Sequence, residues 1–242
     1  MMELYLVRHA QATNNVVGAP FTYEPSLTPW GARQAKSLAQ YLADNALPHL
    51  AKRTPRERLA DEGRTGFAIT HLYCSPMWRS LQTAEILAPL LKLTPEVWID
   101  IHERGGACPE DGGGAYAGKS RQEIQAHFPS FLLPAGITEH GWWFRETEDA
   151  ALCAERVRRV ATSLQARAQQ DERILLVSHG AFVDGLIKVL SGAPLSDQFA
   201  YHHFNTGITR IDFRPDGVYI LYLNRVEHLT RLYRLSQMFR QE

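Results

Sequence analysis

Short apolar runs recur along the chain, and polar or turn-forming residues bound each of them. Runs of this length and setting are typical of buried strands. Four such runs predict strands in the first three quarters of the chain: 4–7, 68–74, 96–101 and 173–177. Two later runs, 207–213 and 218–223, flank Pro215-Asp216-Gly217, and this turn sequence predicts that they pair as a hairpin.

The segments between these strands carry apolar residues at helical spacing. At the start of the first segment, Thr28 is suited to be the N-cap and Pro29 to be the first helical residue. Helices are predicted over five segments: 31–44, 77–91, 119–128, 148–169 and 181–190. Strands that alternate with helices predict an α/β protein, a three-layer α/β/α sandwich with a mostly parallel central sheet and helices on both faces.

No internal repeat and no separating linker interrupts this pattern, so we predict a single domain over residues 1–242. Two segments differ from the rest. Residues 48–66 are polar and bounded by Pro and Gly, which indicates an insertion or a mobile loop. Residues 104–118 are rich in Gly, and because a loop this long is usually functional, we interpret it as an active-site loop.

Composition narrows the class of protein. Lys plus Arg and Asp plus Glu are 26 each, and this zero net charge argues against nonspecific binding to nucleic acid or to an anionic membrane. Cys74, Cys108 and Cys153 are an odd and dispersed set, which excludes a disulfide framework and indicates a reducing compartment. No signal peptide is visible and no apolar stretch approaches the ~20 residues of a membrane span, so we expect a cytoplasmic protein.

Polar residues gather directly after three of the predicted strands: Arg8-His9, Ser75–Arg79 and Ser178-His179-Gly180. Ligands bind beyond the carboxyl ends of strands in open α/β sheets, so two His and two Arg are expected to meet in one crevice. Two guanidiniums repel each other unless an anion lies between them, and their planar shape matches phosphate or carboxylate. The sequence therefore favours a phosphate site.

Several blocks of the sequence occur in the order found in one family. They are Val7-Arg8-His9-Ala10, Asn15, Leu27–Ala35, Ser75–Glu85 and Val177-Ser178-His179-Gly180. Each block is weak evidence alone, but the ordered set resembles the histidine phosphatase (phosphoglycerate-mutase-like) superfamily and spans most of the chain. Ala10 stands where the family pattern has Gly.

The resemblance implies a two-step phosphoryl transfer that needs no metal and no cofactor. Uncharged His9 would attack phosphorus and become phosphohistidine, and the neighbouring Arg8 and Arg79 are expected to depress the pKa of His9. The phosphate oxygens would be held by donors that match the family pattern: Arg8, Asn15, Arg79, His179 and Gly180. Because the guanidiniums neutralise the charge, no metal ion is required.

A general acid must protonate the leaving oxygen. The resemblance points to Glu103, which would then act as the base that activates water. From the residues alone, Glu110 and Asp111 in the Gly-rich loop stay as alternatives. Trp142-Trp143-Phe144 is open to two interpretations, as a wall of the substrate pocket or as ordinary core.

One motif points to a different class of protein. Residues 113–120 match the P-loop pattern Gly-x4-Gly-Lys-Ser, which would indicate an NTPase. That pattern requires a buried strand before it, and residues 105–112, which contain Pro and three Gly, do not form one. We therefore set the P-loop aside, and we find no metal-ligand spacing such as His-Glu-x-x-His.

The predicted function is a phosphomonoester hydrolase that acts on a small phosphorylated metabolite. One alternative is a phosphoglycerate mutase, which is disfavoured because the segment between Asn15 and Leu27 does not match that of mutases. The other is a phospho-ligand-binding member without catalysis, which is disfavoured because both His, both Arg and a candidate acid are present. The identity of the substrate and the oligomeric state stay open.

Overall fold

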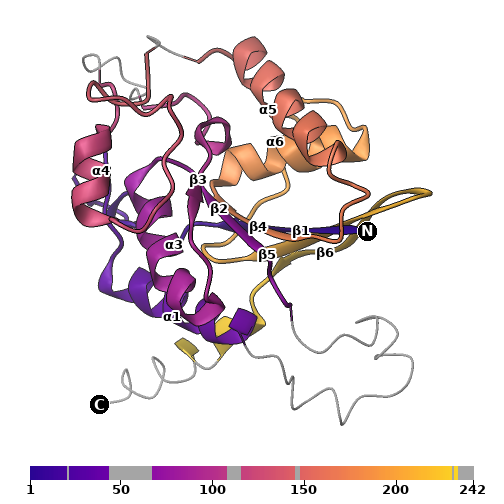
Figure 1. Cartoon of the computed structure of the whole chain (residues 1–242), viewed down its shortest axis with the longest axis horizontal. Helices are drawn as coiled ribbons and strands as arrows, with labels where there is room; N and C mark the ends of the chain where they lie inside the picture. The colour runs from indigo at the N-terminus through magenta and orange to yellow at the C-terminus, as the bar shows by residue number, and fades with distance from the viewer. Residues whose placement is uncertain (21, 44–66, 108–115, 145–147, 231, 234–242) are drawn as a thin grey trace.

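The centre of the molecule is a six-stranded sheet with the strand order β3-β2-β4-β1-β5-β6 (Figure 1). The computed structural model describes residues 1–20, 22–43, 67–107, 116–144, 148–230 and 232–233. Within them the strands are β1 (Met2–Arg8), β2 (His71–Cys74), β3 (Glu96–Val97), β4 (Arg173–Ser178), β5 (Ile208–Arg214) and β6 (Gly217–Arg225). The insertion predicted at 48–66 and residues 108–115 of the Gly-rich loop lie outside the described residues.

Four adjacent strands of the sheet are parallel. β3 pairs with β2, β2 with β4 and β4 with β1, all in parallel, whereas β5 and β6 add an antiparallel edge. The mostly parallel sheet and the late hairpin are thus confirmed. Arg8 is level with Ser178, and Cys74 is level with Val177, so β1, β2 and β4 end at the same height. Polar residues that follow these strands therefore emerge side by side.

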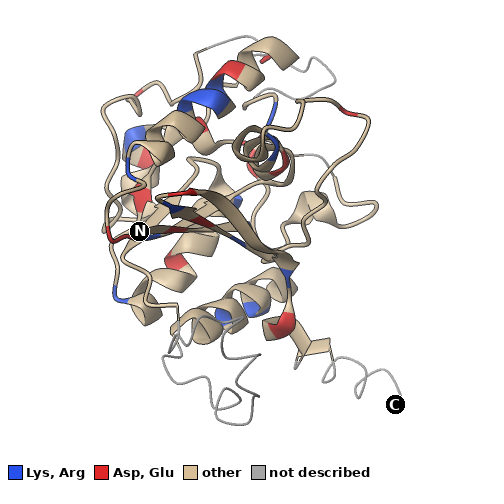
Figure 2. Cartoon of the chain, turned by 90° about the vertical axis from the view of Figure 1, so that its right-hand side faces the viewer, with Lys and Arg blue, Asp and Glu red and all other residues tan. Residues whose placement is uncertain are grey.

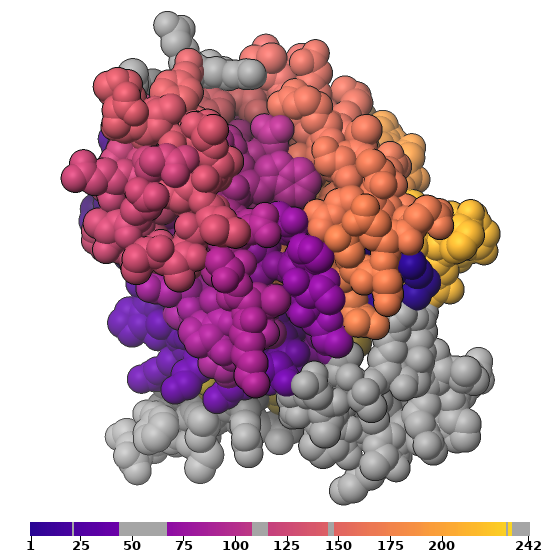
Figure 3. All heavy atoms as spheres, in the orientation of Figure 1, coloured from indigo at the N-terminus to yellow at the C-terminus, as the bar shows by residue number. Residues whose placement is uncertain are grey.

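Helices cover both faces of the sheet, as the sequence predicts (Figure 1). They are α1 (Pro29–Ala43), α3 (Trp78–Leu91), α4 (Arg121–His127), α5 (Ala150–Gln165) and α6 (Gly180–Ser191). Short 3-10 turns are η1 (Thr13–Asn15), η3 (Ile99–Ile101) and η4 (Glu227–Leu229). The α1–α3 pair packs on one face and the α5–α6 pair on the other, which completes three layers. In Figure 3 the orange α5–α6 pair and the magenta segment with α4 form opposite sides of the visible surface.

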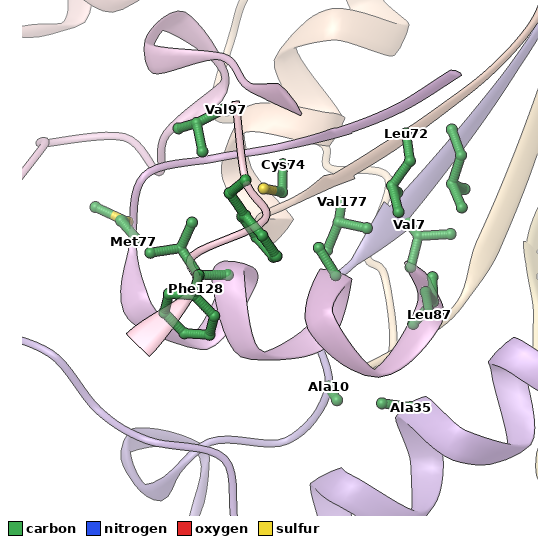
Figure 4. Close-up of a cluster of buried hydrophobic side chains, with 14 of the residues drawn as sticks. Val7, Ala10, Ala35, Leu72, Cys74, Met77, Leu87, Val97, Phe128 and Val177 are labelled. Atoms are coloured by element: carbon green, nitrogen blue, oxygen red, sulfur yellow. The ribbon is translucent and has the colours of Figure 1, made fainter. Parts of the chain in front are cut away.

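Side chains that point alternately to the two faces of the sheet form two hydrophobic cores. In β1, Tyr5 and Val7 face the α1–α3 pair, whereas Leu4 and Leu6 face the α5–α6 pair, because successive side chains of a strand point to opposite faces. Figure 4 shows the first core, where Ala10 and Ala35 point toward one another. Charged positions of both signs are mixed along the helices in Figure 2.

The predicted strand at 96–101 is wrong beyond Val97. The chain turns into η3 there, and Ile101 is buried against the α5–α6 pair. A short apolar run indicates that its residues are buried, but it does not indicate whether they form a strand or a turn. Here the buried Ile101 lies in a turn. The consequence is functional, because the turn places Glu103 at the end of the sheet.

Several other boundaries also differ from the prediction, and three have a clear local cause. The strand predicted from residue 68 begins at His71, because Ala68 has a φ of 45° and cannot continue a strand. The helix predicted from residue 119 begins after Ser120, whose side chain accepts a hydrogen bond from the Glu123 amide. The helix predicted over 148–169 spans Ala150–Gln165, because Asp149 caps it.

The start of α1 lies against the loop that follows β1. Thr28 Oγ1 accepts a hydrogen bond from the Gly31 amide at 2.9 Å, which confirms Thr28 as the cap. A Cβ atom on Gly31 would collide with the backbone carbonyl of Gln11. Glycine therefore allows α1 to approach the chain two residues after His9.

We expect Gly31→Ala to lower the free energy of unfolding by about 1–3 kcal/mol through overpacking, although alanine is normally the better helix former. Gly185→Ala in α6 is the matched control, because its nearest neighbour would be Val157 Cγ2 at 3.4 Å. That variant should be neutral or stabilising by up to about 1 kcal/mol. Urea unfolding measures both, and equal effects would contradict the close approach.

Candidate active site

The predicted site residues meet at the carboxyl end of the sheet. Arg8 ends β1, and His9 follows it. Arg79 lies in the first turn of α3, and His179 is the N-cap of α6. The ring centroids of His9 and His179 are 5.1 Å apart, and Arg79 Nε lies 3.1 Å from His9 Nε2. The structure thus brings both histidines and both arginines together, as the sequence predicts.

His9 is held in one tautomer. Its ring is buried, and Nδ1 lies 2.8 Å from the carbonyl oxygen of Ala10. A carbonyl only accepts, so Nδ1 carries the proton and Nε2 keeps its lone pair, which accepts the hydrogen bond from Arg79. Burial, and then the charges of Arg79 and Arg8, hold the pKa of His9 well below its ordinary value. The result is an uncharged imidazole with a nucleophilic Nε2.

His179 presents the opposite nitrogen. Its Nε2 lies 2.5 Å from Ser75 Oγ, an oxygen that also accepts the Met77 amide at 3.4 Å. Among the described residues the Ser75 hydroxyl has no other acceptor for its proton, so it donates to Nε2, and the imidazole proton then lies on Nδ1. Burial, and then the charge of Arg79, keep the pKa of His179 well below its ordinary value. His179 Nδ1 is buried, and no group among the described residues accepts its hydrogen.

Arg8 leaves a second buried donor unused. Its Nη1 donates to the carbonyl of His203 at 2.7 Å, whereas its buried Nε finds no acceptor within the described part of the chain. A Cβ atom on Gly180 would lie 3.7 Å from this Nε, so the guanidinium lies against the first residue of α6. Buried donors without acceptors are rare in folded proteins. Arg8 Nε and His179 Nδ1, near Arg79 and the N-terminus of α6, are donors suited to an anion.

Glu103 is bound to the first turn of α6. Its Oε1 accepts the amides of Phe182 and Arg104 at 3.1 and 3.0 Å, and its Oε2 accepts the Ala181 amide at 3.4 Å. Burial lowers the pKa of Arg8 and of Arg79, and the charge of Glu103 opposes that shift in both. The carboxylate is therefore near both guanidiniums. Glu110 and Asp111 lie outside the described residues.

Asn15 is linked to the backbone of His9 through Asn205. Its Oδ1 accepts the Ala12 amide at 3.0 Å and Asn205 Nδ2 at 3.3 Å. Asn205 Nδ2 also donates to the backbone carbonyl of His9 at 2.9 Å. The carbonyl oxygen of Asn15 is thus engaged, and its amide nitrogen is the group that an anion would use.

Three positioning residues were missed from the sequence. Ser75 fixes the tautomer of His179, and Asn205 holds the His9 backbone. Thr83 Oγ1 accepts the Ala10 amide at 3.1 Å and donates to the carbonyl of Arg79 at 2.7 Å. Ser75 and Thr83 lie inside the sequence block that carries Arg79, and this position could have identified them. No sequence feature identifies Asn205, because 196 residues separate it from His9.

The structure also places the other open residues. Trp142 and Trp143 are buried in the core and contact the ring of His102, and together with the exposed Phe144 they line a cavity beside it, so the segment is both core and cavity wall. Lys119 Nζ pairs with Glu123 at 2.8 Å, and no described strand directly precedes it, so the P-loop finds no support.

Within the described ranges, no group of three or more His, Cys, Asp or Glu side chains is arranged to hold a metal. Nor is any described helix long and apolar enough to span a bilayer.

Fold and site together define an α/β protein with a buried, uncharged histidine beside two arginines at the carboxyl end of its sheet. A family model described as the histidine phosphatase superfamily (branch 1) matches residues 4–58 and 53–226. The chain belongs to this superfamily, and the family predicted from the motifs is confirmed.

Similar proteins carry phosphatase names. A Hydrogenobacter thermophilus protein named "Putative phosphoserine phosphatase 2" is 27% identical over 236 residues, which cover 96% of this chain and 100% of that protein. A phosphoserine phosphatase mutant from Entamoeba histolytica, solved with phosphoserine, is 22% identical with a TM-score of 0.57, covering 95% of this chain and 100% of its own. The alpha-ribazole phosphatase from Shigella flexneri is 20% identical with a TM-score of 0.61, covering 93% and 96%. These structures share the fold.

We expect His9 to stay uncharged as the pH falls through 6.5, because its folded-state pKa is depressed. Histidine NMR, with His9 assigned from His9→Gln, measures this directly. The unfolded chain takes up a proton near pH 6.5 that folded His9 does not. The free energy of unfolding should therefore fall below that pH, and less steeply in His9→Gln. A His9 resonance that titrates near 6.5 would contradict the assignment.

We expect Arg79→Lys to lower kcat/KM by about 10²-fold or more, on the scale of one preorganised donor, about 2.7–4 kcal/mol. An ammonium does not reproduce a guanidinium that donates to His9 and faces an anion with its other nitrogens. Lys119→Ala is the control and should have little effect, because Lys119 pairs with Glu123. A loss below about threefold in Arg79→Lys would place Arg79 outside the site.

Proposed function

We propose that this phosphatase hydrolyses small phosphorylated metabolites through a phosphohistidine at His9. The observation that carries the proposal is the pair of buried, unused donors, Arg8 Nε and His179 Nδ1, beside the lone pair of His9 Nε2. A tetrahedral phosphoryl group supplies acceptors for these donors and an electrophilic phosphorus for Nε2. The names of the relatives make phosphoserine the first substrate to test.

In the first step, His9 Nε2 attacks phosphorus, and the bond from phosphorus to the leaving oxygen breaks. The charge on the three equatorial oxygens is met by donors already fixed in the fold. These are Arg8, Asn15, Arg79, His179 and the amide of Gly180. Glu103 gives the leaving oxygen its proton as the general acid.

In the second step, water attacks the phosphohistidine from the side that the alcohol has left. Glu103 takes the proton of the water, the P–N bond breaks, and inorganic phosphate leaves with the lone pair restored on His9. The guanidiniums carry the charge through both steps, so the proposal needs neither a metal nor a cofactor. A mutase would instead return the phosphoryl group to a second hydroxyl.

We expect ³²P-labelled substrate to give an acid-labile, base-stable phosphoenzyme in the presence of EDTA. His9→Ala should form none, because the variant lacks the imidazole nitrogen that attacks phosphorus. His140→Ala is the control, since that side chain is 80% exposed. Turnover by His9→Ala at the wild-type rate would refute the mechanism. Label that appears in a new ester rather than in inorganic phosphate would identify a mutase.

We expect Glu103→Gln to slow phosphoenzyme formation from an alkyl phosphate by about 10²–10⁴-fold, because an alkoxide hardly leaves without a proton. p-Nitrophenolate leaves unaided, so the burst from p-nitrophenyl phosphate should slow far less. Pre-steady-state bursts isolate this first step from the second, in which Glu103 also acts. Equal slowing of both bursts would make Glu103 structural and move attention to Glu110 and Asp111.

A further inference from the structure

A buried ion pair lies directly behind the segment that carries Glu103. Arg156 of α5 donates from Nε and Nη2 to the two carboxylate oxygens of Glu148, each at 2.6 Å. The two side chains are 3% and 2% exposed. Burial alone would raise the pKa of Glu148, but the hydrogen bonds and the charge of Arg156 lower it. The pair is therefore ionised and fixed in a fork-to-fork geometry.

The pair also holds the backbone on both sides of Glu103. Arg156 Nη1 donates to the carbonyls of Asp100 and His102 at 2.7 and 3.0 Å. Glu148 Oε2 accepts the amide of Gly105 at 3.3 Å. Residues 100, 102 and 105 are thereby tied to one rigid unit, and Glu103 lies between the ties.

The same guanidinium contacts the helix that receives the Glu103 carboxylate. Its carbon lies 5.3 Å from the ring centroid of Phe182, in a cation–π contact. The Phe182 amide donates to Glu103 Oε1 at 3.1 Å. Arg156 thus contacts both the segment that carries the Glu103 carboxylate and the turn of α6 that binds it. It therefore fixes the position of one relative to the other.

Stability alone is a weak reason for such a pair. Burying two charges is costly, and well-packed apolar residues often serve a core equally well. What apolar residues cannot do is bind three backbone polar groups of an irregular segment at defined positions. The contacts of Arg156 and Glu148 fall on the one segment in which angstrom-scale placement matters for proton transfer.

We propose that Arg156 and Glu148 are positioning residues for the general acid. The inference rests on the proposed function of Glu103. It implies that weakening the pair impairs protonation of the leaving group and spares the attack by His9, whose contacts lie elsewhere.

The test uses Arg156→Lys and Glu148→Gln in the full chain. Lysine keeps the charge but does not reach a carboxylate fork and two carbonyls together, and glutamine keeps the shape without the charge. Bursts are measured with p-nitrophenyl phosphate and with the alkyl phosphate that the enzyme turns over, phosphoserine first. We expect the alkyl burst to slow about 10–100-fold and the p-nitrophenyl burst by less than about threefold.

A control and a double variant separate positioning from general damage. Arg159→Lys alters an exposed pair on the same helix, at 3.5 Å from Asp100, and should change neither burst. Arg156→Lys added to Glu103→Gln should slow the alkyl burst by less than about threefold further, since the step it serves is already lost. Thermal unfolding identifies a variant that does not fold, in which case the milder Glu148→Gln decides.

The outcomes distinguish the two proposals. Equal slowing of both substrates by Arg156→Lys and Glu148→Gln, or full additivity with Glu103→Gln, would overturn the positioning role. If Glu103→Gln itself shows no dependence on the leaving group, the proposed acid has failed and the inference falls with it. If Glu103→Gln shows that dependence and the pair variants do not, the inference alone is wrong.

Discussion

Arg79 Nε donates a hydrogen bond to His9 Nε2 inside the protein, and this contact exists only while His9 is uncharged with its proton on Nδ1. A protonated His9 would have no lone pair for Arg79 and would add a third positive charge beside Arg8. Burial and the two guanidiniums act in the same direction on the pKa of His9, so the fold enforces the state that the contact needs. The carbonyl of Ala10 completes it by taking the Nδ1 proton.

The backbone around His9 is fixed from several distant parts of the chain. The level ends of the parallel strands bring β1, β2 and β4 to one edge, and the first turns of α3 and α6 then deliver Arg79 and Gly180. Thr83 holds the peptide of Ala10, and Asn205 holds the carbonyl of His9. Each bond is ordinary, yet together they place the nucleophile before a substrate arrives, which is what preorganisation requires.

The sequence predicted the layers and the four central residues because both depend on local signals. Alternating strands and helices define the sandwich, and polar residues after buried strands define the crevice. Three features depend instead on contacts between distant segments: the short β3, the role of Asn205 and the Arg156–Glu148 pair. The periodicity of apolar residues carries no information about such contacts. Arg156 did leave a trace, since it lies four residues before Val160 on the buried stripe of α5. A charged residue on an apolar stripe indicates a buried partner, although it does not name that partner.

Two largely buried guanidiniums close together repel each other, and the carboxylate of Glu103 offsets this repulsion, because its charge opposes the lowering of the pKa of Arg8 and of Arg79. That carboxylate is bound to the amides of the first turn of α6, close to where a phosphoryl group would meet Gly180. In the proposed reaction a phosphoryl dianion takes over the neutralisation of Arg8 and Arg79. The amides that fix the Glu103 carboxylate therefore lie beside the groups that would meet the phosphoryl group, so one helix N-terminus would position both the proposed acid and the substrate.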